Sequence, residues 1–184
     1  SSSAASDVYK RQSPDAAPFS MSLNLDKPLI GFWLLLACPW VVMPRQARPR
    51  LALLAGALTI AGCLACAWLI DLVQWSPKWP PQAWLWMANN LLLVSLVEEA
   101  LFRGYLQGGL QRLIGANPAL AASALLFGLA HVGGGWAWVA LATLAGAGYG
   151  LAWRHGGLPA ALLAHFGLNL GHFALFTYPQ LAPG

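Results

Sequence analysis

The only two glutamates of the chain, Glu98 and Glu99, are adjacent and lie within a long apolar stretch. A charge at the centre of a membrane helix costs roughly 3 kcal/mol, so such residues are usually functional and need partners or a wet cavity. Arg103 follows Glu99 by four residues, a spacing at which a carboxylate and a guanidinium meet on a helix. Glu98 points about 100° away from Glu99. We therefore expect an ion pair at Glu99 and a carboxylate facing the bundle interior at Glu98; a purely structural ion pair is the alternative.

Three further polar side chains lie in later apolar stretches. His131 closes the stretch Phe127-Gly128-Leu129-Ala130, and His165 and Asn169 are four residues apart on one helix face. Each signal is weak alone, since a single buried histidine is usually a packed residue. At about 1.5 Å per residue, Glu98, His131 and Asn169 lie roughly 17 to 20 Å from the ends of their segments. One plane can therefore hold these three side chains.

The composition indicates which elements hold these groups. Of 184 residues, 58% are hydrophobic and 9% are charged, against roughly a quarter charged in a soluble domain. This predicts an all-α fold, a polytopic integral membrane helical bundle. Several apolar stretches are shorter than the roughly 20 residues of a straight span, so tilted or re-entrant pieces are expected. About six transmembrane segments are predicted, near residues 29–43, 51–73, 83–111, 119–132, 136–153 and 158–178.

The basic residues indicate the orientation rather than a partner. The net charge is +4, but the chain has no long basic stripe of the kind that binds nucleic acid. Arg45, Arg48 and Arg50 crowd the first predicted loop, while Arg112 and Arg154 occupy the third and the fifth. By the positive-inside rule these loops are cytoplasmic, and both termini lie outside.

Other residues are predicted to pack between the helices or to anchor them at the membrane surface. Ala142, Gly146 and Gly150 form a small-residue seam that lets membrane helices approach closely. Cys63 and Cys66 are interpreted as helix-packing residues, because no strand pattern or second cysteine pair accompanies them. His155 is expected in solvent. His172 lies two turns after His165, so packing is favoured and a place in the same cavity is the alternative. Tryptophans where apolar stretches end are predicted to anchor in the headgroup layer; they are Trp75, Trp79, Trp84, Trp136 and Trp153.

The N-terminal residues 1–20 are polar and rich in Ser, Ala and Pro, and they precede Met21. They lack the basic-then-apolar order of a signal peptide. We interpret 1–20 as a disordered or non-native segment and 21–184 as one transmembrane domain, whose motif core spans 91–172.

Three motifs together carry a specific resemblance. Glu98-Glu99-x-x-x-Arg103, Phe127-x-x-x-His131 and His165-x-x-x-Asn169, in this order, resemble those of the CAAX-protease and bacteriocin-processing family, the Rce1-like or Abi proteases. The resemblance implies a transmembrane protease domain and a glutamate-type intramembrane endopeptidase. It implies a membrane-anchored protein or peptide as substrate, the lipid bilayer as surroundings, no nucleic acid and no cofactor.

The resemblance also implies a role for each residue. Glu98 and His131 would activate a water that attacks a peptide carbonyl, which is general base catalysis. His165 and Asn169 would stabilise the oxyanion as donors aimed at developing charge. Glu99 and Arg103 would be structural residues that orient the helix and the water site.

Other readings of the same residues stay open. Glu98, His131 and His165 suffice for a zinc-dependent membrane protease, although the chain lacks a His-Glu-x-x-His helix. Buried ionisable groups also build proton-coupled transporters. A non-enzymatic bacteriocin-immunity or protein-sorting membrane protein would keep the same fold.

The sequence indicates only the class of substrate and the kind of membrane. A prenylated protein, a bacteriocin leader and the C-terminal sorting tail of a surface protein all fit the resemblance. The small size favours a bacterial protein-sorting or peptide-maturation role in the inner (cytoplasmic) membrane.

Overall fold

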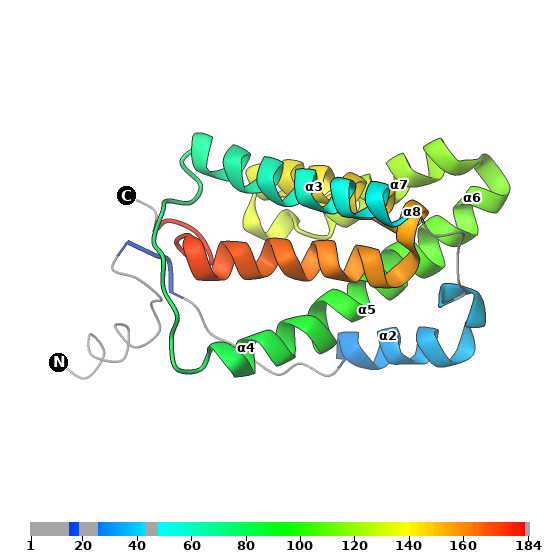
Figure 1. Cartoon of the computed structure of the whole chain (residues 1–184), viewed down its shortest axis with the longest axis horizontal. Coiled ribbons are helices and arrows are strands. Elements are labelled where there is room, and N and C mark those ends of the chain that lie inside the picture. Colours follow the sequence, from blue (N-terminus) through cyan, green and yellow to red (C-terminus); the bar gives the residue numbers. More distant parts are fainter. Residues whose placement is uncertain (1–14, 19–25, 43–47, 183–184) are drawn as a thin grey trace.

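The structure is a computed structural model that describes residues 15–18, 26–42 and 48–182. It is 80% helix, and the described residues contain no strand, only two isolated bridges, Ala16 with Leu181 and Trp75 with Phe176. This composition of elements confirms the predicted all-helical class. Figure 1 shows a bundle in which α3 and part of α8 run side by side while a long helix crosses them obliquely.

The long crossing helix is one continuous run from Ala83 to Ile114, made of five pieces with alternating α and π geometry. The described elements, in chain order, are α2 (Asp26–Ala37), the 3₁₀ turn η1 (Pro39–Val41), α3 (Pro49–Leu69), α4 (Ala83–Asn89), the π-helix η2 (Asn90–Ser95), α5 (Leu96–Glu99), the π-helix η3 (Ala100–Gln107), α6 (Gly108–Ile114), α7 (Ala116–Leu129), the 3₁₀ turn η4 (Val132–Gly134) and α8 (Trp136–Leu175).

The 40 residues of α8 are two helices joined at a sharp reversal. Gly157 has φ 71° and ψ −165°, far from helical values, and glycine adopts positive φ at little steric cost. Ring contacts join the two halves in antiparallel order, with Trp138 beside His172 at 5.7 Å and Tyr149 beside His165 at 4.7 Å between centroids. The reversal therefore brings the end of α8 back alongside its beginning.

Three helices are long and apolar enough to cross a membrane, namely Pro49–Leu69, Ala83–Ile114 and Trp136–Leu175. The apolar helices Pro28–Ala37 and Ala116–Leu129 are shorter. The chain is therefore an integral membrane protein by its helices, but the predicted six spans are not confirmed. The count differs because two predicted segments are short helices and two others form the single folded-back α8.

Small residues let the helices of this bundle approach closely, as the seam in α8 predicts. A Cβ added to Gly146 would lie 3.2 Å from the Cα of Ala124, and one added to Gly150 would lie 2.6 Å from Oε1 of Gln107. Gly148 leaves the same kind of space for Thr59, whose Oγ1 would lie 1.8 Å from an added Cβ. These glycines fix how near α3, η3 and α7 come to the first half of α8.

The structure contradicts the tryptophan prediction at one of the five positions. Trp75, Trp79, Trp84 and Trp136 are exposed, as expected of anchors at the membrane surface, whereas Trp153 is 1% exposed. Its indole packs over the helix position of Gly108, where an added Cβ would touch the ring at 3.4 Å. An apolar stretch that ends near a tryptophan does not show whether the ring faces lipid or a glycine on a neighbouring helix.

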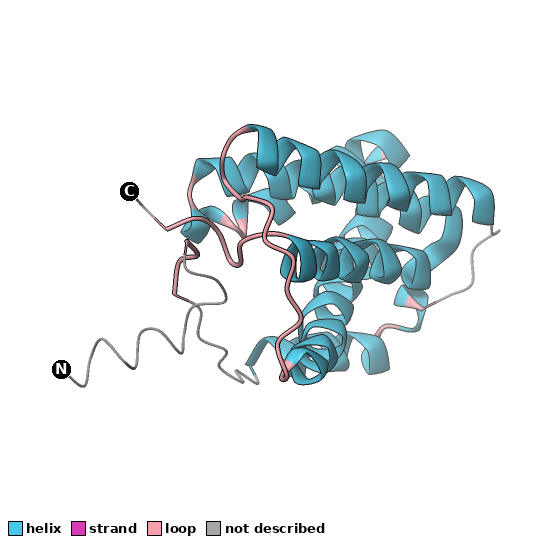
Figure 2. Ribbon diagram, turned by 60° about the vertical axis from the view of Figure 1, so that its left-hand side comes forward, coloured by secondary structure: helices cyan, strands magenta, loops and turns pink. Residues whose placement is uncertain are grey.

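Loops gather at the end of the bundle that carries the C-terminus (Figure 2). The backbone N–H of Thr177 donates to the carbonyl of Gln74 at 2.8 Å, and the N–H of Ala17 donates to the carbonyl of Gln180 at 2.9 Å. Residues 15–18 thus lie against the C-terminal segment, while the rest of the predicted disordered N-terminus, 1–14 and 19–20, lies outside the described residues. Arg45 of the predicted cytoplasmic loop lies outside them as well.

Candidate active site

The two glutamates lie in α5, a single α-helical turn between the π-helices η2 and η3. The backbone N–H of Leu96 donates to the carbonyl of Leu91, five residues earlier, which is the π pattern. π-turns within α-helices are rare and are frequent at functional sites. They widen the helix and redirect its side chains, so the α-helical angles used in the sequence analysis do not apply to this segment as a whole.

Glu99 and Arg103 meet as their spacing predicts. Arg103 Nη1 donates to Glu99 Oε1 at 2.9 Å, and both side chains are fully buried. The second nitrogen, Nη2, donates to the carbonyl of Gly146 at 3.0 Å. The guanidinium carbon also lies 4.4 Å from the ring centroid of Phe127, a favourable cation–π distance. The arginine is therefore held by a carboxylate, a backbone carbonyl and a ring.

Glu99 has a second partner that the sequence analysis did not predict. Its Oε1 lies 2.8 Å from Nδ1 of His165, 66 residues further along the chain. An ionised carboxylate only accepts hydrogen bonds, so Nδ1 of His165 is the donor and Nε2 is directed elsewhere. Glu99 Oε2 is buried and has no hydrogen-bond partner among the described residues. We call Glu99, Arg103 and His165 the ion-pair cluster.

Glu98 has a different environment from Glu99. Its side chain is 21% exposed, and Oε2 lies 3.9 Å from Nε2 of His165, too far for a hydrogen bond. One imidazole therefore has a fully buried carboxylate on Nδ1 and a partly exposed carboxylate near Nε2. The two adjacent glutamates approach the same histidine from its two nitrogens.

Aromatic rings hold the plane of the His165 imidazole. Tyr149 stacks on it with centroids 4.7 Å apart and planes within 13°, and Phe127 meets it edge-on at 5.7 Å. Tyr149 is 1% exposed. Sequence reasoning missed Tyr149 because a tyrosine within an apolar helix carries no signal until its neighbours across the bundle are known.

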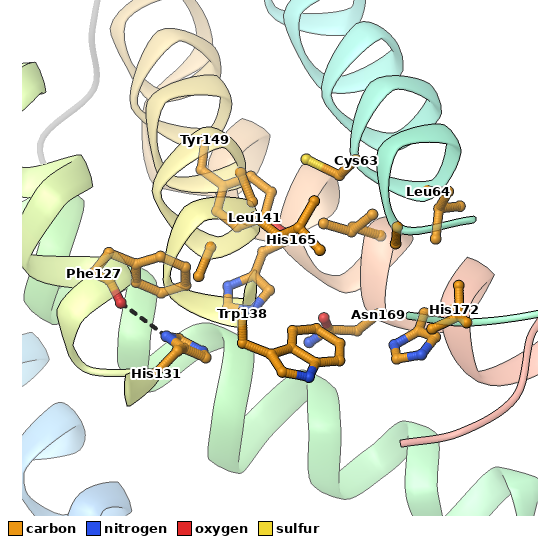
Figure 3. A pocket seen from close by; sticks show the side chains of 15 residues that line it. Cys63, Leu64, Phe127, His131, Trp138, Leu141, Tyr149, His165, Asn169 and His172 are labelled. Atoms are coloured by element: carbon orange, nitrogen blue, oxygen red, sulfur yellow. Dashed lines mark hydrogen bonds between the residues drawn. The ribbon is translucent and has the colours of Figure 1, made fainter. Parts of the chain in front are cut away.

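A cavity of about 90 Å³ lies next to the ion-pair cluster and is lined by three of the six predicted site residues. His131, His165 and Asn169 line it together, as Figure 3 shows. His131 comes from the end of α7, and its Nδ1 lies 2.8 Å from the carbonyl of Phe127. This contact occupies one nitrogen of His131 and leaves the other available to the cavity. The lining residues are Cys63, Leu64, Ala67, Val73, Phe127, His131, Trp138, Leu141, Ala142, Ala145, Tyr149, His165, Leu168, Asn169 and His172.

Two of the predicted placements need qualification. Glu98 is not among the residues that line the cavity; it borders the site through His165. His172, predicted to be a packing residue, lines the cavity, and its Nε2 donates to the carbonyl of Thr177 at 3.1 Å. Cys63 lines the cavity as well, so the interpretation of this cysteine as a packing residue is incomplete.

Asn169 is held by a residue that sequence reasoning also missed. Its Nδ2 donates to Oδ1 of Asn90 at 3.2 Å, and Ser95 Oγ donates to the same oxygen at 3.2 Å. Asn90 and Ser95 belong to η2 and are buried. Their five-residue spacing would have been a signal only if a π-helix had been expected.

Candidate metal ligands are less well grouped than the zinc alternative requires. Across residues 15–18, 26–42 and 48–182, no three His, Cys, Asp or Glu side chains are arranged to hold one ion. Glu98 and His131, two of the three suggested ligands, are joined by no ion pair or hydrogen bond in this part of the chain.

Comparison with known proteins gives one match. The family described as Type II CAAX prenyl endopeptidase Rce1-like matches residues 80–171, half of the 184 residues. No curated protein and no solved structure matches the chain. The matched range begins before α4 and ends after Asn169, so it contains the ion-pair cluster and every residue given a catalytic role by the sequence analysis.

Proposed function

Because the chain belongs to the family of Rce1-like type II CAAX prenyl endopeptidases, we propose that it is an intramembrane endopeptidase of the glutamate type. Its substrate is a membrane-associated protein or peptide, and it hydrolyses a peptide bond without a metal. The observation that carries this proposal is the placement of His131, His165 and Asn169 around one cavity, with Glu98 3.9 Å from Nε2 of His165.

In the proposed reaction, Glu98 and His131 activate one water molecule. No hydrogen bond or ion pair joins the two side chains within the described residues. In this scheme the water is placed between them. Glu98 accepts a proton as the water oxygen attacks the carbonyl carbon, and the carbonyl oxygen becomes an oxyanion. The same proton then passes to the amide nitrogen as the C–N bond breaks, which releases a carboxylic acid and an amine.

His165 and Asn169 stabilise the oxyanion in this mechanism. Since Nδ1 of His165 donates to Glu99, a donor at Nε2 requires the imidazolium form. A carboxylate lies near each nitrogen of that ring, and the guanidinium of Arg103 is paired with one of the two carboxylates. An imidazolium at His165 would bring the four formal charges to zero (two negative, two positive). Neutrality matters because an unbalanced charge is expensive inside a membrane. Asn169 adds an uncharged N–H donor to the same oxyanion.

Glu99 and Arg103 act as orienting residues. The carboxylate of Glu99 fixes the tautomer and the direction of His165, as a carboxylate does for catalytic histidines in general. Arg103 fixes Glu99 and connects it to the backbone of α8 at Gly146. This role extends the one expected from sequence, where Glu99 and Arg103 were assigned to the helix and the water site.

The proposed membrane placement is a six-segment arrangement in a bacterial inner membrane. In it the two halves of α8 and the short apolar helices α2 and α7 each count as a segment. Arg48, just before α3, and Arg50, in the first turn of α3, face the cytoplasm in this arrangement, as the positive-inside rule predicts. The proposal leaves open a prenylated protein, a bacteriocin leader or a C-terminal sorting tail as substrate.

The decisive test is cleavage of a membrane-embedded peptide by purified, reconstituted protein. Glu98→Gln keeps the side-chain shape and removes the base, so kcat should fall by about 10² to 10⁴ while the protein stays folded. His155→Ala, a histidine that does not line the cavity, is the matched control for His131→Ala and should keep full activity. Wild-type cleavage by the Glu98→Gln protein would end the glutamate mechanism.

The same preparation separates the glutamate mechanism from the zinc-dependent one. Metal content is measured for the wild type and for the His131→Ala and His165→Ala proteins, and cleavage is measured before and after chelation. We expect chelator-resistant activity. One zinc per chain that is lost together with either histidine would establish the zinc alternative. Absence of cleavage by every protein, the wild type included, would favour the transporter or the non-enzymatic reading.

A further inference from the structure

The side-chain amide of Asn169 is bound to a buried amide on another helix. Asn169 lies in the second half of α8, beside His165 in the cavity (Figure 3). Its Nδ2 donates to Oδ1 of Asn90 at 3.2 Å, and Asn90 is only 6% exposed. Asn90 lies eight residues before Glu98 in the same long helix. The helix that carries both glutamates therefore also contacts Asn169.

The π geometry of η2 makes the other contact of Asn90. Five residues advance an α-helix by about 140° beyond a full turn, which would separate Asn90 from Ser95. In a π-helix the hydrogen-bonded neighbour is five residues away, so the two side chains lie above one another. Ser95 Oγ donates to Oδ1 of Asn90 at 3.2 Å, and Ser95 is fully buried. A helix irregularity thus produces a buried polar pair directed at Asn169.

The contact selects one orientation of the Asn169 amide. A terminal amide has a donor end and an acceptor end, and its last torsion has two broad wells that differ by a flip. With Nδ2 at Oδ1 of Asn90, one N–H is used and the second N–H of the same nitrogen is available to the cavity. As long as Asn90 presents Oδ1 to Asn169 and to the Ser95 hydroxyl, the flipped amide would set two carbonyl oxygens against each other, which is repulsive. An amide that turned its oxygen toward an oxyanion would oppose catalysis.

We propose that Asn90 is a positioning residue that fixes the amide of Asn169 with its N–H toward the oxyanion, and that Ser95 supports Asn90 through the π-turn of η2. This inference rests on the proposed function, because it requires Asn169 to act as an oxyanion donor. Asn90 itself touches neither the substrate nor the attacking water in this scheme.

Packing alone is a poor explanation of the pair. Hydrogen bonds between membrane helices contribute only about 0.6 kcal/mol on average, and an apolar residue at either position would avoid burying polar atoms. A contribution to catalysis explains why an amide and a hydroxyl share one oxygen beside the cavity. The structural and the positioning explanations differ in what they predict for kinetics.

The first experiment measures kcat and KM for Asn90→Ala on a membrane-embedded peptide. Loss of one orienting hydrogen bond should lower kcat about tenfold and leave KM unchanged, since Asn90 does not bind the substrate. Asn89→Ala removes the same side chain one residue earlier and is the matched control, with unchanged kcat. Equal effects of the two variants, or a change confined to KM, would overturn the proposal.

A double-mutant cycle distinguishes a positioning role of Asn90 from a purely structural one. In the Asn169→Ala background, Asn90→Ala should have no further effect on kcat, because the group it positions is gone. The cycle is measured under single-turnover conditions with long incubation so that the slow background remains measurable. A tenfold loss that persists in the Asn169→Ala background would show that Asn90 acts on folding or on another group.

Ser95→Ala repeats the cycle if Asn90→Ala does not yield folded protein. It removes one of the two hydrogen bonds at Oδ1 of Asn90 and should lower kcat about threefold, again only when Asn169 is present. Failure of this inference and of the proposed function are distinguishable. Full activity of Asn169→Ala contradicts the oxyanion role itself, whereas an impaired Asn169→Ala protein with fully active Asn90→Ala and Ser95→Ala proteins contradicts only the positioning role.

Discussion

The ion-pair cluster and the cavity beside it are built in opposite ways. Glu99 and Arg103 are fully buried, and each makes at least two polar contacts. Around the cavity, Glu98 is partly exposed and makes no hydrogen bond that joins it to His165, and His131 is held through one nitrogen only. The charged groups of the cluster are paired and closed off from solvent, although Glu99 Oε2 and Arg103 Nε have no hydrogen-bond partner among the described residues. The cavity side retains unused donors and acceptors. His165 belongs to both, so the rigid part of the site orients the reactive part.

The largest effect is expected when the cluster loses its cation. Arg103→Ala leaves the buried Glu99 carboxylate without its guanidinium, and removing one partner of a buried pair typically costs about 3 to 5 kcal/mol. Both folding and cleavage should suffer, which thermal unfolding in detergent and the peptide assay would detect. Arg50→Ala, an exposed arginine, is the control. If Arg103→Ala were as stable and as active as the wild type, the cluster would not have the closed character described here.

Substitution of a residue that lines the cavity should reduce cleavage without reducing stability, in contrast to Arg103→Ala. His131→Ala should lower kcat by about 10² to 10⁴ with little change in the unfolding temperature, because His131 is only partly buried and has one hydrogen bond. The loss should not add to that of Glu98→Gln, since both act on one water. Additive losses in the double variant, measured under single-turnover conditions, would show that Glu98 and His131 act independently and not on one water.

Overpacking the cluster tests how closed it is. In Gly146→Ala the new Cβ would lie 3.1 Å from Arg103 Nη2 and 3.2 Å from Phe127 Cδ1, so the guanidinium and the ring must move. We expect a stability loss of about 1 to 3 kcal/mol and reduced cleavage. Gly62→Ala meets nothing within 4 Å and serves as the control in the same unfolding measurement. Equal stability of the two variants would show that the cluster can accommodate an added methyl group and is not tightly packed.

The smallest effect concerns the ring that stacks on His165. Tyr149→Phe retains the stacked ring and should leave both stability and kcat near wild type. Tyr149→Leu removes it and should cost about 0.5 to 1.5 kcal/mol beyond the change in buried area, with a modest fall in kcat as the imidazole loosens. A fall in kcat for Tyr149→Phe equal to that for Tyr149→Leu would instead assign a role to the phenolic hydroxyl.

Local spacing made part of this site predictable. The four-residue steps from Glu99 to Arg103 and from His165 to Asn169 are helix periodicities, and the order of the three motifs identified the family. The contact from Glu99 to His165 was not predictable, since it joins residues 66 positions apart whose meeting depends on the reversal at Gly157. The contact from Asn90 to Ser95 was not predictable either, because α-helical geometry separates them.

Burial was harder to predict than helix content. Apolar composition alone gives the all-helical class, but it does not distinguish a tryptophan that faces lipid from one that faces a glycine, as Trp153 shows. It also does not fix the number of spans, because the apolar helix α7 has 14 residues and is shorter than the three helices that are long enough to cross a membrane. What the sequence lacks in both cases is the identity of the neighbouring helix.

The closeness of Glu99 and Arg103 along the chain has a consequence for biosynthesis. The helix that carries them is synthesised before the second half of α8, so Glu99 and Arg103 exist together before His165 is made. The charge of Glu99 is compensated from the start by a guanidinium one turn away, within the same inserting segment. A carboxylate whose only partner lay 66 residues downstream would be an uncompensated charge in the membrane until that partner was synthesised. Because of the four-residue spacing, Arg103 compensates the charge of Glu99 during insertion without His165. His165 then binds a carboxylate that is already paired.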